Sequence, residues 1–325
     1  MKKRETRQVM KLVIQIPCLN EEKTLPSVLE SIPKKIPGVT SIDVIIIDDG
    51  CTDNTVKIAR KHGVKHVVHH AYKQGLARGF HDGIVKALEL GADIIVNTDG
   101  DNQYPSKDIS RLVKPIVEGK ADIVIANRQV QTIKHFSAGK KLLQRIGTGV
   151  LNVAAGTKVP DAPSGFRAYS RDAAIRLNVV TVFSYTMETI IQAANKRLHI
   201  VSIPITTNAK TRESRLFKSP WEHVFKSGTA ILRAFVMYRP YVVFMSLGTL
   251  LLVLGMVPFI RYLVFVILDH TSGARHLQSL ILGSVLIAGS FISFTLGVVA
   301  DLIRINRILI EDSLEHQKHV RFDKR

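Results

Sequence analysis

Residues 94–105 read IIVNTDGDNQYP, so a short apolar run passes directly into an acidic turn. The β-branched run at its start is typical of strands buried in parallel sheets, and Gly100 lets the backbone bend where the strand ends. The turn carries three oxygen ligands suited to Mg²⁺ or Mn²⁺, namely Asp99, Asp101 and the amide oxygen of Gln103. Acidic residues beside glycine are also ordinary turn chemistry, so the prediction of a metal and diphosphate site depends on the neighbouring motifs.

The composition favours an intracellular domain with an anionic partner. The chain has 325 residues, enough for a catalytic domain and a smaller second part, and a formal net charge of +18. That charge suits a nucleotide, a lipid phosphate, a membrane surface or a nucleic acid. Cys18 and Cys51 each adjoin a strand pattern, which favours reduced thiols. The apolar run after the basic amino terminus is too short for a signal peptide, so we expect the first domain in the cytosol.

Alternating strands and helices predict a doubly wound α/β domain. Strand patterns occur at 12–16, 44–47, 64–69, 94–96, 121–126 and 200–205, with helical patterns between them. This order predicts a mostly parallel sheet with helices on both faces and ligands at the carboxyl ends of the strands. A Rossmann dinucleotide site is disfavoured, because no Gly-x-Gly-x-x-Gly follows the first strand.

Several polar side chains are expected on that edge. Asp48 or Asp49 would accept from a base N–H or a ribose hydroxyl, and Arg78 would meet phosphate or base. Arg128 follows another strand, and Asp161 lies in a turn-rich loop as a free carboxylate. Each could instead serve only as a cap or turn residue. The helix expected at 140–155 is basic and presents either an anion-facing or a merely solvated surface.

Two long apolar stretches predict a membrane hairpin. Residues 241–260 and 279–300 are each long enough to cross a bilayer and lack an amphipathic stripe. Basic residues flank both, which places both termini in the cytosol: Arg233, Arg239, Arg304, Arg307, Lys318, Arg321, Lys324 and Arg325. Apolar and basic residues mixed over 217–239 predict an interfacial helix on anionic lipid.

Five motifs together carry a family resemblance that covers nearly the whole chain. They are IPCLNEE at 16–22, IDDGCTD at 47–53, TDGDNQ at 98–103, DAPSGFR at 161–167 and RESR at 212–215. With these motifs in this order, the sequence resembles a family 2 glycosyltransferase of the polyprenyl-phosphate sugar synthase type, similar to dolichyl-phosphate mannose synthases and bacterial undecaprenyl-phosphate glucosyltransferases.

The resemblance implies a GT-A fold and assigns roles to the motif residues. Nucleoside contacts would come from Pro17, Asn20, Glu21, Asp48 and Asp49, and Asp99, Asp101 and Gln103 would hold the metal and diphosphate. Arg128 and a basic residue near Lys141 would receive the acceptor phosphate, Asp161 would orient the acceptor or act as a weak base, and Arg212 with Arg215 would reach the donor diphosphate. Arg78, Gly100 and Ser164 complete the candidate substrate-binding set.

The sequence departs from the family pattern at two places. Cys51 stands where serine is usual, and the basic loop lacks the glycine and lysine of the mannose synthases' Arg-x-x-Gly-x-Ser-Lys. The second departure weakens any inference of mannose or GDP specificity.

The expected protein is a metal-dependent, inverting membrane glycosyltransferase. It would move one sugar from a UDP- or GDP-hexose to undecaprenyl or dolichyl phosphate. Its expected parts are a cytosolic catalytic domain (1–216), the interfacial helix (217–239), two transmembrane helices (240–303) and a basic cytosolic tail (304–325). The resemblance also suggests a homo-oligomer such as a tetramer, with close helix packing between subunits at Gly248, Gly255, Gly283, Gly289 and Gly297.

Two alternatives remain. One is a family 2 synthase that extends a polysaccharide, although the chain lacks that group's Gln-x-x-Arg-Trp motif and a larger pore. The other is a non-catalytic, basic, membrane-anchored binding protein. Only 6% of the residues are aromatic and they form no aromatic-basic platform, which argues against a nucleic-acid partner.

Overall fold

The computed structural model describes residues 10–132, 138–179, 185–208, 229, 236–269 and 277–322. Arg212, Arg215 and most of the predicted interfacial helix lie outside these residues. The chain divides into two compact units. The first unit comprises Met1–Ile231 and Leu314–Arg325, and the second comprises Leu232–Ser313.

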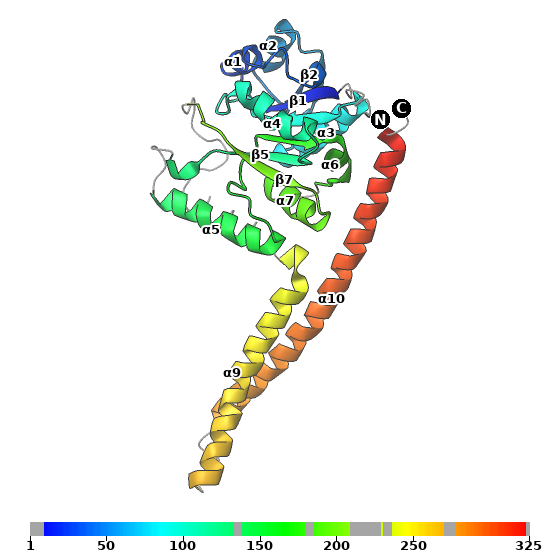
Figure 1. Ribbon diagram of the computed structural model, residues 1–325. Helices are drawn as coiled ribbons and strands as arrows, with labels where there is room; N and C mark the ends of the chain where they lie inside the picture. The colour runs from blue at the N-terminus through cyan, green and yellow to red at the C-terminus, as the bar shows by residue number, and fades with distance from the viewer. Residues whose placement is uncertain are drawn as a thin grey trace, which may run out of the picture. The chain divides into compact units, whose positions relative to one another are not determined.

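The first unit is built on a seven-stranded, mostly parallel sheet (Figure 1), which confirms the predicted fold class. The strands are β1 Met10–Cys18, β2 Val39–Asp48, β3 His66–His69, β4 Ile94–Asn97, β5 Ile123–Asn127, β6 Arg167–Ser170 and β7 Ile200–Pro204. Their order is β3-β2-β1-β4-β6-β5-β7, and β6 alone among these strands runs antiparallel to its neighbours. Because β1 to β4 are parallel, their carboxyl ends lie along one edge of the sheet.

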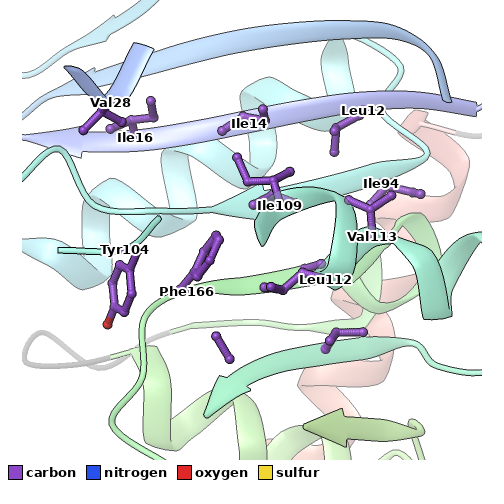
Figure 2. Close-up of a cluster of buried hydrophobic side chains, with 14 of the residues drawn as sticks. Leu12, Ile14, Ile16, Val28, Ile94, Tyr104, Ile109, Leu112, Val113 and Phe166 are labelled. Atoms are coloured by element: carbon purple, nitrogen blue, oxygen red, sulfur yellow. The ribbon is translucent and has the colours of Figure 1, made fainter. Parts of the chain in front are cut away.

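Helices flank this sheet on both faces. They are α1 Leu25–Glu30, α2 Thr55–Lys61, α3 Leu76–Glu89, α4 Ile109–Val117, α5 Ala138–Ala155, α6 Arg171–Arg176 and α7 Tyr185–Asn195, with 3₁₀ turns η1 Ser106–Asp108 and η2 Val130–Thr132. Successive side chains of a strand point to opposite faces, so alternate residues of β1 pack on different helices. Leu12, Ile14 and Ile16 join the buried cluster that includes Leu112 and Val113 of α4 (Figure 2).

The opposite face of β1 is packed just as closely. A Cβ atom placed on Gly83 of α3 would lie only 2.3 Å from Oε1 of Gln15. The helix therefore approaches the sheet at a glycine, and the buried amide of Gln15 fills the space beneath it.

The antiparallel strand β6 was not predicted. Its register places Arg167 beside Asn97, the last residue of β4. Because β6 runs against β4, the chain that leads into it, residues 161–166, lies at the carboxyl end of β4. The DAPSGFR loop thus reaches the acidic turn through strand pairing.

The second unit contains two helices that are long and apolar enough to cross a membrane, Pro240–Ile267 and Leu277–Phe322. They belong to α9 (Pro240–Asp269) and α10 (Leu277–Phe322), which run side by side. Many of their apolar side chains are exposed, as expected for lipid-facing surfaces. This finding supports membrane association.

Four of the five glycines in these helices make close contacts within the hairpin. A Cβ atom on Gly255 would lie 3.0 Å from the carbonyl oxygen of Gly283, and one on Gly248 would lie 2.5 Å from the Phe294 ring. Gly297 lies against Phe244 and Met245 in the same way, whereas Gly289 is looser. The sequence analysis assigned these glycines to contacts between subunits. In the structure, four of them instead make contacts between α9 and α10 of the same chain.

The carboxyl-terminal end of α10 packs within the first unit, where the sequence predicted a separate tail. Glu315 accepts from Lys196 Nζ at 2.7 Å and lies 3.1 Å from Arg176 Nε. Lys318 Nζ donates to the Leu177 carbonyl and to Asn178 Oδ1 at 2.9 and 2.6 Å. The last turns of α10 are thus part of the first unit's own packing.

Replacement of Glu315 by alanine is expected to destabilise the first unit. The change leaves the side chains of Lys196 and Arg176, which are 11% and 27% exposed, without their shared carboxylate. A loss of about 2 kcal/mol, or roughly 4–8 °C in the thermal midpoint, should follow. Scanning fluorimetry of the full chain in detergent measures it, with Asp312→Ala on the exposed face of the same helix as the control. An unchanged midpoint for Glu315→Ala would show that this contact contributes nothing to stability.

Candidate active site

The acidic turn lies directly after β4 and is held by its own side chains. Asp101 Oδ1 accepts from the Gln103 backbone N–H at 3.1 Å, and its Oδ2 accepts from Gln103 Nε2 at 2.9 Å. Asn102 takes the left-handed conformation (φ 58°), which asparagine tolerates better than most residues. Gln103 therefore orients the Asp101 carboxylate within the turn.

A buried polar network supports the turn from below. Gln15 Nε2 donates to Asn97 Oδ1 at 3.0 Å, and Asn97 Nδ2 donates to the Gly165 carbonyl and to the Tyr185 hydroxyl at 2.9 and 2.8 Å. The Tyr104 hydroxyl accepts from the Gly165 N–H at 3.2 Å. Burial raises the pKa of both tyrosines, so both hydroxyls stay protonated, and the Tyr185 hydroxyl also donates to the Gly165 carbonyl at 3.2 Å. The network fixes β4, the 161–166 loop and α7 relative to one another.

The loop after β1 bonds both to the acidic turn and to the loop after β2. Thr24 Oγ1 lies 2.8 Å from the Gly100 carbonyl oxygen and 2.9 Å from Glu21 Oε2, so its one hydrogen is shared between them. Asn20, at φ 56°, accepts from the Thr52 N–H at 2.8 Å through Oδ1. A Cβ atom on Gly100 would lie 3.0 Å from Cys18 Sγ and 3.5 Å from the Pro17 carbonyl. The predicted nucleoside residues of two loops are thus brought together beside the turn.

Asp48 and Asp49 are both buried and already bonded. Asp48 accepts from the Cys51 N–H at 2.7 Å and lies 2.6 Å from His69 Nδ1. Burial alone would raise the pKa of Asp48, but these hydrogen bonds lower it, so the group is ionised. Asp49 accepts from the N–H groups of Gln74 and Gly75, where α3 begins, at 2.7 and 3.0 Å.

Arg78 is fixed through a further acid. Its Nε donates to Asp82 Oδ2 at 2.8 Å, and the same oxygen lies 3.1 Å from His70 Nε2. The Arg78 side chain remains 61% exposed, so its outer nitrogens are accessible. His70 lies within hydrogen-bond distance of both Asp49 and Asp82. It therefore links Asp49 to Arg78, two residues that the sequence assigned to donor binding.

Arg128 and Asp161 form one paired unit, which corrects the prediction of a free carboxylate at 161. Two parallel bonds of 2.8 Å join the guanidinium to the carboxylate, and Asp161 also accepts from the Arg128 N–H and from Gln144 Nε2. Asp161 is 1% exposed and the Arg128 side chain 20%. Burial alone would lower the pKa of Arg128, but the nearby Tyr104, Asp161 and Asp99 have the larger, opposite effect. The pKa of Arg128 is therefore raised above its ordinary value. Lys141 donates to the Gln131 carbonyl at 2.8 Å instead of joining this pair.

Arg167 holds the DAPSGFR loop in its shape. It is fully buried and donates to the carbonyls of Ala162, Ser164 and Thr186 and to the Thr189 hydroxyl, all within 2.9 Å. Ser164 is also fully buried, and in the described part of the chain its hydroxyl has no hydrogen-bond partner. The loop is therefore preorganised next to Asp99 by an internal cation.

The donor set fits a hard divalent cation that shares its coordination with a diphosphate. Gly165 faces Asp99, and a Cβ atom there would lie 3.7 Å from Asp99 Oδ1 and 2.9 Å from the Tyr185 hydroxyl. Glycine at position 165 therefore places no side chain against the Asp99 carboxylate. Among the described residues no group of three or more His, Cys, Asp or Glu side chains gathers to hold a metal. Two carboxylates completed by phosphate oxygens and water are the usual Mg²⁺ arrangement.

Sequence reasoning missed four residues that shape this site, His69, His70, Asn97 and Arg167. The histidines could have been found from the parallel register, since the end of β3 must lie beside Asp48 and Asp49. The roles of Asn97 and Arg167 depend on β6, whose four residues, RAYS, gave no clear strand signal. Arg212 and Arg215 lie outside the described residues, although Asn208, shortly before them, bonds to Gln103 and Asn102 of the acidic turn.

Comparisons with known proteins agree with this geometry. Residues 13–177, about half of the chain, match the family described as Glycosyl transferase family 2. A polyprenol monophosphomannose synthase of Mycolicibacterium smegmatis is 25% identical over 211 residues, which cover 62% of this chain and 78% of that protein. A UDP-N-acetylglucosamine–dolichyl-phosphate N-acetylglucosaminyltransferase of Methanococcus voltae is 28% identical over 218 residues, covering 59% and 83%.

A solved structure shares the fold. The glucosyl-3-phosphoglycerate synthase of Mycobacterium tuberculosis, crystallised with Mn²⁺, UDP and glucosyl-3-phosphoglycerate, superposes with a TM-score of 0.54 at 21% identity. The match covers 70% of this chain and 79% of that one. At this identity the likeness establishes the GT-A architecture.

Proposed function

The chain belongs to glycosyl transferase family 2, and we propose that it transfers one sugar from a nucleotide-sugar to a polyprenyl monophosphate at a membrane surface. Relatives named for polyprenol, dolichyl-phosphate and undecaprenyl-phosphate acceptors support this acceptor class. The two apolar helices support it as well, because a long isoprenoid remains in the bilayer.

The observation that carries the proposal is the double role of α5. Its inner face contributes Gln144, which bonds to Asp161, and the buried Leu151. Its outer face exposes an apolar stripe at helical spacing, formed by Leu142, Ile146, Val150 and Val153. One helix thus joins a candidate phosphate-binding pair to a surface that suits lipid. A lipid phosphate has an anionic group that suits the Arg128–Asp161 pair and an apolar chain that suits the exposed stripe.

For the donor, we assign the nucleoside to the loops after β1 and β2 and the diphosphate to the acidic turn. Asp99 and Asp101 would hold Mg²⁺ or Mn²⁺, which supplies charge stabilisation to the leaving diphosphate. The Mn²⁺ and UDP bound to the solved structure of the same fold support this assignment. Arg212 and Arg215 follow the segment that bonds to the acidic turn and are proposed to reach the same diphosphate.

The chemistry needs little help from a base. A phosphate monoester has a second pKa of about 6, so the acceptor is already largely dianionic at neutral pH. Its oxygen attacks the anomeric carbon, the bond from that carbon to the diphosphate breaks, and the configuration inverts. Arg128 would draw the acceptor phosphate into place, while Asp161 holds the guanidinium in a fixed orientation. Asp161 is thus proposed as a positioning residue, since its oxygens are engaged by Arg128 and Gln144.

Charge also supports an orientation in the membrane. The basic residues that flank the two spans favour a catalytic domain and both termini in the cytosol. A homo-oligomer stays a prediction, and it would need an interface other than the glycine contacts already used within the hairpin.

The deciding experiment is a matrix of donors and acceptors. Full-length protein in detergent, with Mn²⁺ or Mg²⁺, is incubated with UDP- and GDP-sugars and with undecaprenyl or dolichyl phosphate. Mass spectrometry should find a glycolipid that bears a single sugar. Several sugars per acceptor would favour a polysaccharide-extending synthase, and no product from any pair would reject the polyprenyl acceptor.

Charge on the outer face of α5 is expected to reduce use of the lipid acceptor. The double change Ile146→Glu and Val153→Glu places two carboxylates on exposed apolar positions, so the fold should be retained. Each charge that meets lipid costs on the order of 1–3 kcal/mol, so acceptor KM should rise by about tenfold or more. Transfer to undecaprenyl phosphate in liposomes measures it, with Ile146→Ser and Val153→Ser as the uncharged control. An unchanged KM for the charged variant would place the lipid elsewhere.

A further inference from the structure

His69 is the last residue of β3 and His70 follows it, and each ring faces one of two acids, Asp48 at the end of β2 and Asp49 directly after it. Backbone register pairs Asp48 with His69, and Asp48 in turn with Cys18 of β1. His69 Nδ1 lies 2.6 Å from Asp48 Oδ2, and His70 Nδ1 lies 3.0 Å from Asp49 Oδ1. Both rings therefore stand at the carboxyl-end edge of three successive parallel strands, the edge where α/β sheets bind ligands.

The two rings differ in what they leave available. His70 is 9% exposed, and its second nitrogen faces Asp82 at 3.1 Å, so both of its nitrogens are used inside the protein. The His69 side chain is 66% exposed. Asp48 is the one hydrogen-bond partner that its ring has among the described residues, so Nε2 is accessible from solvent.

Hydrogen-bond chemistry then fixes the character of that free nitrogen. An ionised carboxylate only accepts, so Nδ1 of His69 must carry the hydrogen that it shares with Asp48. In a neutral imidazole the other nitrogen then has a lone pair and accepts. The bond to Asp48 thus directs Nδ1 inward and, in the neutral ring, leaves Nε2 as an acceptor at the edge of the nucleoside loops.

We propose that His69 is a donor-binding residue whose Nε2 accepts a hydrogen bond from the nucleoside of the nucleotide-sugar, through either a base N–H or a ribose hydroxyl. This inference rests on the proposed function, which supplies the nucleotide. Asp48 then acts mainly through His69, since its own oxygens are already bonded to Cys51 and to the ring.

Binding of UDP and of GDP to the full-length protein with Mn²⁺ tests the assignment by calorimetry. His69→Asn can keep the bond to Asp48 and removes the Nε2 acceptor, so the Kd of the preferred nucleotide should rise about five- to tenfold. The thermal midpoint should not change, because the side chain is exposed. His70→Asn is the matched control, and it should lower the midpoint because it breaks a buried bridge between Asp49 and Asp82.

Nucleotide analogues identify the contacted group. The 2′-deoxy diphosphate and the diphosphate methylated at the base N–H each remove one candidate hydrogen. The analogue that lacks the contacted hydrogen should bind wild type and His69→Asn equally, whereas the other should keep the difference.

Three results would overturn the proposal. Equal affinity of wild type and His69→Asn for the natural nucleotide would reject His69 as a contact while leaving the glycosyltransferase function intact. Weak binding by His69→Ala that His69→Asn fully restores would reduce the role of His69 to holding Asp48. Failure of the wild type to bind either UDP or GDP would instead overturn the proposed donor class, and the inference with it.

Discussion

Replacement of Asp101 by alanine is expected to abolish sugar transfer while the protein remains folded. The carboxylate would hold the metal that neutralises the leaving diphosphate, and such charge stabilisation is worth several kcal/mol in the transition state. Activity should therefore fall by about 10³-fold or more. Its two bonds to Gln103 lie within one turn, so the change should lower the thermal midpoint only slightly.

Asp101→Asn is the sharper variant. It can keep the bond from the Gln103 N–H and removes only the charge, so it should fail as Asp101→Ala does. Affinity for UDP or GDP should lose its dependence on Mn²⁺ in both variants. Asp172→Ala, at an exposed acid on α6, controls for loss of a carboxylate elsewhere. Near wild-type transfer by Asp101→Asn would reject the metal role.

Replacement of Arg128 by alanine is expected to damage both stability and activity. It leaves the carboxylate of Asp161, 1% exposed, without its bidentate partner. Removal of one member of a buried ion pair costs about 3–5 kcal/mol, which would lower the thermal midpoint by roughly 10 °C or more. Transfer should also be lost, because the acceptor phosphate loses its proposed cation.

A double variant separates the two effects. In Arg128→Met with Asp161→Leu, no uncompensated charge is left, so much of the lost stability should return. Transfer should stay absent, and only Arg128→Lys should keep part of it, since lysine preserves the charge without the paired geometry. Full activity of the double variant would remove the acceptor role from this pair. An unchanged midpoint for Arg128→Ala would show that the pair is not structural.

The sequence by itself determined the fold class and the order of the strand-end motifs. Strands buried on both faces read as unbroken β-branched runs, so β4 and its acidic turn were visible at 94–105. Because parallel strands all end at one edge, Asp48, Asp99 and Arg128 could be assigned to a common edge without coordinates. The two long apolar helices were equally clear, since each contains the run of about twenty apolar residues that a bilayer core would require.

Only the tertiary structure decided how these side chains are paired. β6 is four residues long, and its antiparallel pairing with β4 brings the DAPSGFR loop to Asp99. Its sequence, RAYS, is neither an unbroken apolar run like that of β4 nor an alternating pattern, so nothing in it marks a strand. The sequence predicted a free carboxylate at Asp161, whereas the structure pairs it with Arg128, 33 residues away in the chain. Composition can place a charge at an edge of the sheet, but which opposite charge it meets depends on long-range packing.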